Sequence, residues 1–180
     1  MEKHFPNDRN ILTSAAKRKV PVYIPAFTDC EMGVDLAVRY IHKTNGFQKK
    51  PFINGEVLPY NPFVDLMDFS HRIYNHQGPL AIFTIGGGVP RNWGQQVAPL
   101  IDIMSQQGFP VDPCFFSRGV RICPEPAHWG GLSGCSYKEG VSWGKFIPES
   151  KGGKYAEVHA DATTVLPLLI KAVFEKIDKL

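Results

Sequence analysis

The stretch LAIFTIGGGVPRNW (residues 80–93) decides the fold class, because an apolar run ends there in three glycines and a helical pattern follows. Residues 80–85 are β-branched, aromatic and apolar, which predicts a buried strand. Similar runs, VPVYIPAF (20–27), GVRIC (119–123) and AEVHA (156–160), predict further strands. Apolar strands without period-two alternation are typical of a parallel sheet that helices cover on both faces.

Helical periodicity separates the predicted strands. It predicts helices near residues 31–46, 62–77, 93–104 and 163–178. Pro99 should bend the third helix. Thr163 or Thr164 can cap the last helix, and Pro167 is tolerated if it lies in the first turn. The alternation of strands and helices therefore predicts an α/β fold with a mostly parallel sheet.

The composition excludes several classes of protein. Hydrophobic residues make up 43% and charged residues 21% of the 180 residues, as in ordinary globular proteins, and this length fits a single domain over residues 1–180. The net charge is only +3, with small basic clusters at 17–19 and 49–50, so we expect no nucleic-acid partner. We also expect no membrane partner, because no apolar run is long enough to span a bilayer and the first ten residues do not resemble a secretory signal.

The cysteines favour a reducing cytoplasm. Cys30, Cys114, Cys123 and Cys135 are too few and too irregularly spaced for a disulfide framework in a chain of this length. Cys114, Cys123, His128 and Cys135 are separated by nine, five and seven residues, without a CxxC pair, which argues against a zinc site. A catalytic Cys–His pair stays open, although no local motif supports one.

Ligands of parallel α/β proteins bind beyond the carboxyl ends of the strands. This rule selects Thr28-Asp29, Gly86 to Asn92 and Asp161-Ala162. The glycines allow a nucleotide or substrate to approach the backbone before a helix, or they form only a tight turn. Arg91 stands where a Rossmann fingerprint has its third glycine. Asp161 can hydrogen-bond a ribose hydroxyl or cap the next helix, and Asp29 leaves the same two alternatives.

The segment GLSGCSYKEGVSWGKFIPES (131–150) places Lys145 beside Trp143, among few other charges. A lysine is a nucleophile only as the neutral amine, and burial against an indole in a dry pocket favours that form. Gly144 would let the backbone turn so that both side chains reach one cavity, and Glu139 could hold a cationic amine. The alternative is an exposed ammonium group whose aliphatic stem lies over the indole.

Four motifs together resemble the deoxyhypusine synthase family. They are, in the family's order, IPAFTD (24–29), TIGGGVPRNW (84–93), GLSGCSYKEGVSWGKF (131–146) and YAEVHADATTVLPLLIKAVF (155–174). The resemblance runs from about Asn10 to the end and is to the C-terminal half of longer chains. It implies a Rossmann-like deoxyhypusine synthase fold that is incomplete, with the N-terminal half absent.

The resemblance implies an NAD-dependent aminobutyltransferase. In the family, NAD removes hydride from spermidine and diaminopropane leaves. A lysine then carries the aminobutyl group as an imine to a lysine of a translation-factor precursor. By resemblance, Lys145 is this nucleophile. The polyamine pocket would comprise Trp143, Glu139, Gly87, Asn92 and Asp35, and NAD would contact Asp29, Asp161, Ala162 and Gly86.

The chain differs from eukaryotic members at three pocket positions. Asn92 replaces a histidine, Leu132 replaces an aspartate, and Val34, next to Asp35, replaces a second acid. These changes resemble the prokaryotic deoxyhypusine synthase-like branch, in which a diamine can be the acceptor, as in homospermidine synthesis. The alternatives to deoxyhypusine synthesis are therefore transfer to a diamine and a non-catalytic half of a split enzyme. We expect a homo-oligomer, or a complex with a chain that supplies the N-terminal half.

Overall fold

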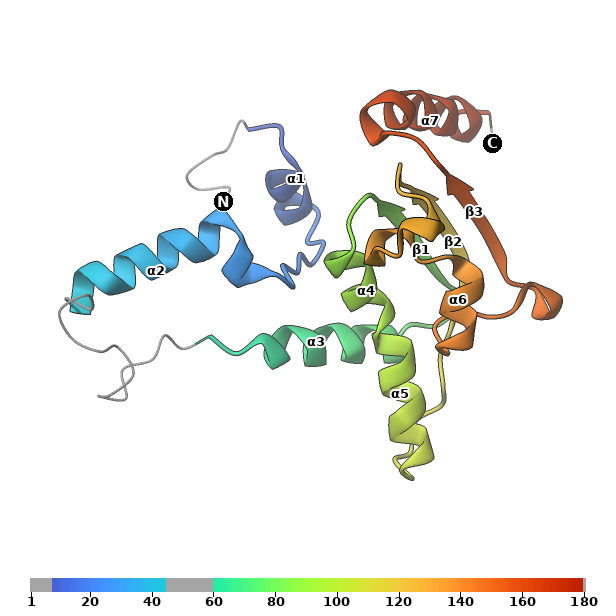
Figure 1. The fold of residues 1–180 in the computed structure, drawn as a ribbon, viewed down its shortest axis with the longest axis horizontal. Helices are drawn as coiled ribbons and strands as arrows, with labels where there is room; N and C mark the ends of the chain where they lie inside the picture. The colour runs from blue at the N-terminus through green and yellow to red at the C-terminus, as the bar shows by residue number, and fades with distance from the viewer. Residues whose placement is uncertain (1–7, 45–59, 180) are drawn as a thin grey trace. The chain divides into compact units, whose positions relative to one another are not determined.

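The computed structural model describes residues 8–44 and 60–179 (Figure 1). The chain divides into two compact units, Met1–Asn61 and Pro62–Leu180, and each is described by itself. The described part of the first unit contains α1 (Ile11–Lys17), a 3-10 turn, η1 (Phe27–Asp29), and α2 (Glu31–Thr44). The expectation of a single domain over the whole chain stays a prediction.

Residues 20–27 do not form the predicted strand. They are an irregular segment that leads into η1. Pro21 and Pro25 each remove a backbone donor from this segment, and the described part of the first unit contains no strand to pair with it. The helix predicted over 31–46 is confirmed as α2, but its predicted end at Gly46 lies outside the described residues.

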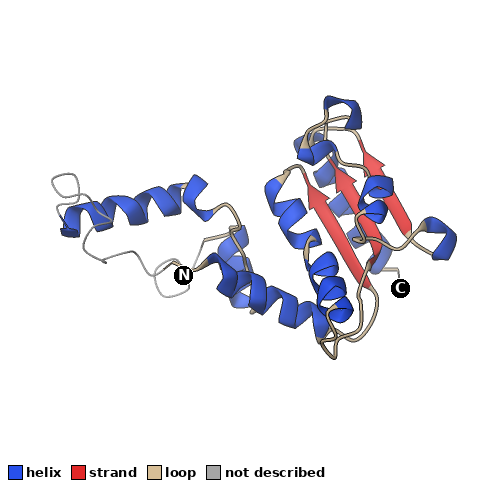
Figure 2. Cartoon of the chain, turned by 60° about the horizontal axis from the view of Figure 1, so that its bottom comes forward, coloured by secondary structure: helices blue, strands red, loops and turns tan. Residues whose placement is uncertain are grey.

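The second unit is built on a parallel sheet (Figure 2). Its strands are β1 (Leu80–Ile85), β2 (Phe116–Ile122) and β3 (Lys154–Val158), in the order β1-β2-β3. In the register, Ile82 lies opposite Gly119, and Gly119 lies opposite Tyr155. The strands predicted at 80–85, 119–123 and 156–160 are thus confirmed, with shifts at the ends of the last two.

The core lies on the sheet face that carries Ile82 and Tyr155. Its helices are α3 (Pro62–Tyr74), α4 (Val89–Gln95), α5 (Val97–Gln106) and α6 (Tyr137–Ser142). The buried cluster comprises Leu80, Val97, Ile101, Phe116, Tyr137 and Phe146. A Cβ atom on Gly119 would lie 2.5 Å from the Tyr137 ring, so the glycine is what allows this ring to lie flat on β2.

The α/β class, with a parallel sheet flanked by helices, is confirmed. On the face opposite the core, Phe83 and Ile85 of β1 are 49% and 46% exposed. The last helix, α7 (Ala162–Ile177), follows β3 and also keeps apolar side chains in solvent, among them Leu168 and Phe174. Within the described part of the chain, no helix is both long and apolar enough to cross a membrane.

Two helix details differ from the sequence predictions. The helix predicted over 93–104 is divided at Gln96 into α4 and α5, rather than bent at Pro99. Pro99 is the third residue of α5, where its missing N–H has no helical partner to lose. Asp161, rather than either threonine, caps α7, and Pro167 lies beyond the first turn of that helix.

Candidate functional site

The end of α6 determines where Lys145 lies. Gly144 has φ +67°, a left-handed conformation that favours glycine. Its N–H donates to the carbonyl of Val141, and the N–H of Lys145 donates to the carbonyl of Gly140, both at 3.0 Å. These two bonds form a Schellman motif, a common way to end a helix. Lys145 is therefore set in place by the helix end itself.

The backbone after this turn joins β2. The N–H of Phe116 donates to the carbonyl of Lys145 at 3.0 Å, and the N–H of Ile147 donates to the carbonyl of Phe116 at 3.0 Å. Between them, Phe146 is 2% exposed and belongs to the core. A Cβ atom on Gly140 would lie 2.7 Å from the Phe146 ring, so this glycine leaves space for the ring. The backbone of Lys145 is hydrogen-bonded on both sides.

The three glycines after β1 bring Asn92 toward Lys145. Gly86 and Gly87 have φ +59° and +64°, and Gly88 precedes α4. A Cβ atom on Gly88 would lie 3.0 Å from the Cβ atom of Leu132, so α4 begins close to the turn after β2. From α4, the Oδ1 atom of Asn92 accepts a hydrogen bond from the Nζ atom of Lys145 at 2.7 Å.

These elements enclose a cavity of about 460 Å³. Its lining comprises Asn92, Gln96, Ala127, Gly130, Gly131, Leu132, Cys135, Glu139, Trp143 and Lys145. Lys145 is 6% exposed, whereas Trp143 is 66% exposed. The sequence analysis expected the two side chains to reach one cavity, and they do. The indole is mostly exposed, whereas the lysine beside it in the sequence is buried.

The surroundings of Lys145 favour its neutral form. Burial lowers the pKa of Lys145 below the ordinary lysine value of 10.5, and the nearby Arg91 guanidinium acts in the same direction. Cys135 and Glu139 act in the opposite direction, but more weakly than burial. The pKa of Cys135 is in turn raised, first by burial and then by Glu139, so this neighbour is a neutral thiol at physiological pH.

Arg91 carries a further positive charge beside the cavity. It is 5% exposed, and its guanidinium lies 5.7 Å from the centre of the Tyr137 ring. Its Nε and Nη2 atoms are buried and have no hydrogen-bond partner among the residues that the structure describes. Because Arg91 is a buried cation near Lys145, it disfavours a positive charge on the Lys145 amine.

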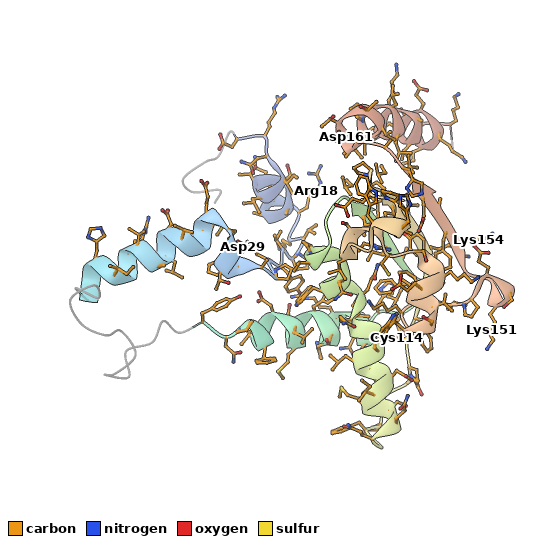
Figure 3. All side chains as sticks on the ribbon, viewed as in Figure 1. Arg18, Asp29, Cys114, Lys151, Lys154 and Asp161 are labelled. Atoms are coloured by element: carbon orange, nitrogen blue, oxygen red, sulfur yellow. The ribbon has the colours of Figure 1, made fainter. Side chains whose placement is uncertain are left out.

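The other predicted residues are not among the described residues that line this cavity. Gly86 and Gly87 follow β1, and Asp161 and Ala162 come three and four residues after the end of β3. Because the strands are parallel, both segments lie beyond the same edge of the sheet. Asp29 and Asp35 belong to the first unit, in η1 and α2. Figure 3 labels Asp29 and Asp161.

Asp161 has a structural task in the second unit. Its Oδ1 atom accepts hydrogen bonds from the N–H and the hydroxyl of Thr163, at 2.8 and 2.5 Å. It is thus the cap of α7, one of the two alternatives that the sequence left open. The hydrogen bonds from Thr163 lower the pKa of this exposed carboxyl group.

Five residues of the cavity lining were not assigned from the sequence: Gln96, Ala127, Gly130, Gly131 and Cys135. Gln96 lies four residues after Asn92, a spacing that places both on one side of a helix and could have revealed it. Cys135 lies between the turn after β2 and α6, and no motif marks it as a wall residue. Among the described residues, no group of three His, Cys, Asp or Glu side chains is arranged to hold a metal ion.

Comparison with known proteins decides the family. The family model for deoxyhypusine synthase matches residues 1–173, which is almost the whole chain. The chain belongs to the deoxyhypusine synthase family. The resemblance on the glycine turn, the SWGK motif and the ADAT segment is therefore confirmed.

Curated members of the family are similar along most of the chain. It is 29% identical over 167 residues to the probable deoxyhypusine synthase 2 of Methanosarcina acetivorans, covering 93% of this chain and 42% of that protein. Identity is 31% over 163 residues with the probable deoxyhypusine synthase 2 of Archaeoglobus fulgidus, covering 90% and 47%. For the deoxyhypusine synthase-like protein of Chlorobaculum parvum it is 29% over 170 residues, covering 94% and 43%. The chain spans about half the length of these relatives.

Proposed function

We propose that this chain takes part in NAD-dependent transfer of the aminobutyl group of spermidine to a lysine of a translation-factor precursor, with Lys145 as the carrier. One observation supports this role above the others. The Lys145 amine is buried in a cavity wall, its pKa is lowered, and its partner is the neutral carboxamide of Asn92. A surface ammonium group would have none of these features.

The proposed step at Lys145 is an exchange of amines on an imine. The neutral Nζ atom adds to the imine carbon derived from spermidine and forms a new C–N bond. The old C–N bond then breaks, and the two protons given up by Nζ pass to the departing nitrogen of diaminopropane, which leaves as a primary amine. A carrier lysine must be deprotonated for the first of these events, which burial promotes. Asn92 can orient the amine but cannot take up its proton.

Glu139 and Trp143 fit the polyamine part of the proposed site. Both line the cavity that holds Lys145. Glu139 lies in the short helix α6, and Trp143 is the cap residue at the end of that helix. A carboxylate and the face of an indole each attract an alkylammonium group. We propose that they bind spermidine while its reacting carbon approaches Nζ. Gly87, Asn92 and Asp35 remain the other proposed substrate contacts.

The carboxyl edge of the sheet fits part of a dinucleotide. A Cβ atom on Gly86 would meet nothing within 4 Å, so a ligand has free access to this backbone. Asp161 is an exposed carboxylate beyond the same edge. We propose that Gly86, Asp161, Ala162 and Asp29 hold NAD, which when bound would supply the hydride acceptor. The Asp161 cap leaves its second carboxylate oxygen for a ribose hydroxyl.

Reductive trapping tests the role of Lys145. The chain is incubated with spermidine and NAD, treated with borohydride and digested, and the modified peptide is identified by mass spectrometry. An aminobutyl group on Lys145 is expected. Lys145→Ala should abolish the adduct, and Lys138→Ala, which removes an exposed lysine of α6, should not change it. Equal labelling of wild type and Lys145→Ala would show that another group is the carrier.

Transfer to a diamine is the second candidate reaction. It is favoured by Leu132, an apolar side chain that lines the cavity where eukaryotic members carry an aspartate, and by Asn92 in place of a histidine. Product analysis after incubation with spermidine, NAD and putrescine separates the two reactions. Homospermidine among the products supports the diamine acceptor, and modification of a precursor protein supports the first proposal.

A partner chain is also part of the proposal. The relatives are about twice as long as this chain, so we propose that it acts in the cytoplasm as a homo-oligomer or together with a chain that supplies the N-terminal half. If the complete complex loses no activity on Lys145→Ala, this chain is a non-catalytic subunit.

A further inference from the structure

A buried arginine is hydrogen-bonded to the turn that forms part of the wall of the Lys145 cavity. Arg121 lies on β2 and is 1% exposed. Its Nη1 atom donates to the backbone carbonyls of Ser133 and Cys135, at 2.6 and 3.2 Å. Its Nη2 atom donates to the Oε2 atom of Glu157 at 2.9 Å. One guanidinium group thus joins two strands to the turn between β2 and α6.

Glu157 completes this connection from β3. It lies opposite Arg121 in the sheet register, and its Oε1 atom accepts a hydrogen bond from the backbone N–H of Tyr137 at 3.3 Å. The ion pair therefore holds three backbone groups between residues 133 and 137. The nearby charged and titratable groups include Arg91 and Tyr137, both of which the charges of Arg121 and Glu157 influence, and His159, whose Nε2 atom lies 4.0 Å from the Oε2 atom of Glu157.

The held segment carries cavity residues on both sides. Leu132 precedes it, Cys135 lies within it, and Glu139 follows it on α6. The same helix ends in the turn that sets Lys145. Neither Arg121 nor Glu157 lines the cavity among the described residues, so their influence on Lys145 passes through this backbone.

We propose that Arg121 and Glu157 are positioning residues for the Lys145 cavity. Together they fix the turn at residues 133–137, so that the wall stays closed over the amine. The planar guanidinium is suited to this task because it donates in several fixed directions at once, which a lysine cannot do. The inference deepens the proposed function, but the geometry on which it depends does not require spermidine or NAD.

Two chemical readouts test the proposal without any substrate. The first is the pH midpoint at which Lys145 is acetylated, followed peptide by peptide. The second is the rate at which Cys135 reacts with iodoacetamide. In Arg121→Lys, the midpoint of Lys145 should rise toward the ordinary lysine value of 10.5, because burial is the main cause of its lowered pKa. Cys135 should react roughly tenfold faster. The reason is that a hydrogen bond to a charged group favours the closed turn over an open one by a factor of about this size.

Matched variants distinguish positioning from general destabilisation. Arg118→Gln changes an arginine on the same strand whose guanidinium donates to the carbonyls of Ser117 and Gly152, away from the turn. This variant should leave both readouts unchanged. Glu157→Gln keeps only one of the two oxygen acceptors and should give readouts between those of the wild type and of Arg121→Lys, whereas Glu157→Ala should resemble Arg121→Lys.

The proposal fails if the readouts do not follow these variants. Unchanged Lys145 and Cys135 reactivity in both Arg121→Lys and Glu157→Ala would overturn it. If Arg121→Lys does not fold, unchanged reactivity in Glu157→Ala alone has the same meaning. Because the readouts need no turnover, a failure of reductive trapping leaves this test intact, and the two proposals can fail separately.

Discussion

Lys145 shows how position, more than residue type, gives a side chain its chemistry. Its amine is buried, donates to Asn92, and lies near the buried cation of Arg91. Trp143, the neighbour that the sequence made prominent, is mostly exposed. Burial in the cavity wall is the main cause of the lowered pKa of Lys145, and the Arg91 guanidinium acts in the same direction.

The first prediction concerns the acetylation of Lys145 as pH is raised. Its midpoint should lie below the ordinary lysine value of 10.5, because burial lowers the pKa of Lys145. Peptide-resolved mass spectrometry after brief acetylation at a series of pH values measures this midpoint. A midpoint at or above 10.5 would contradict the burial of the amine.

The same shift has a consequence for stability. Between the lowered pKa of Lys145 and 10.5, the unfolded chain binds more protons than the folded chain, so Lys145 makes the free energy of unfolding rise with pH. Below that window, the charged amine is a cost to the folded state. Lys145→Met should reduce this rise, as measured by urea unfolding at neutral and alkaline pH. An unaltered pH dependence would count against the shift.

At the scale of elements, the end of α6 depends on the left-handed conformation of one residue, Gly144. Gly144→Ala should lower the free energy of unfolding by about 1 kcal/mol, because alanine is strained in the left-handed conformation. Gly94→Ala is the control, since Gly94 lies within α4 with open space where a Cβ atom would be. It should raise the free energy of unfolding by about 0.5 kcal/mol. Denaturant titrations compare the two variants.

The interpretation is wrong if both alanines have the same effect. A second outcome checks the link to the site. Because Gly144 sets the direction of Lys145, Gly144→Ala should also shift the acetylation midpoint of Lys145, and Gly94→Ala should not.

Local patterns explain which elements could be predicted from the sequence. The apolar run at 80–85 and its glycines predicted β1 and the turn to α4, because both depend on neighbouring residues. The run at 20–27 misled for a physical reason, since a strand exists only when another strand accepts its hydrogen bonds. The division at Gln96 could not be foreseen, because the proline that suggested a bend fits the first turn of α5.

The candidate site also has parts that could be predicted from the sequence and parts that could not. The SWGK motif placed Lys145, Trp143 and the turn between them, since these features lie within one short segment. The bond from Arg121 to Glu157 joins residues 36 apart in the chain. It depends on the register of β2 with β3, which no local pattern contains.

At the scale of the whole molecule, the cavity belongs to the second unit as far as the structure describes its lining. The described residues that line the cavity, and the members of the buried cluster, all lie within Pro62–Leu180. In the described part of the first unit, Thr13 is the buried side chain, and apolar residues such as Ile11 and Val34 are exposed. The core therefore depends on the second unit.

The corresponding prediction is that residues 62–180 fold when produced alone. The fragment should unfold cooperatively on heating, because its core is contained within it. The acetylation midpoint of Lys145 should equal that of the full chain, which peptide mapping of both proteins can establish. A fragment without a cooperative transition would show that the first unit is needed for the core.

The hydrogen bonds on either side of Lys145 have a mechanical consequence. The N–H of Lys145 is bonded to Gly140 and its carbonyl to Phe116, so its backbone is fixed and only its side-chain torsions can change. A group bound to Nζ can therefore move within the cavity, but a backbone movement cannot carry it outward. In the proposed reaction, the acceptor amine would therefore have to enter the cavity, and the side chain that bears it would have to be long and narrow enough to do so.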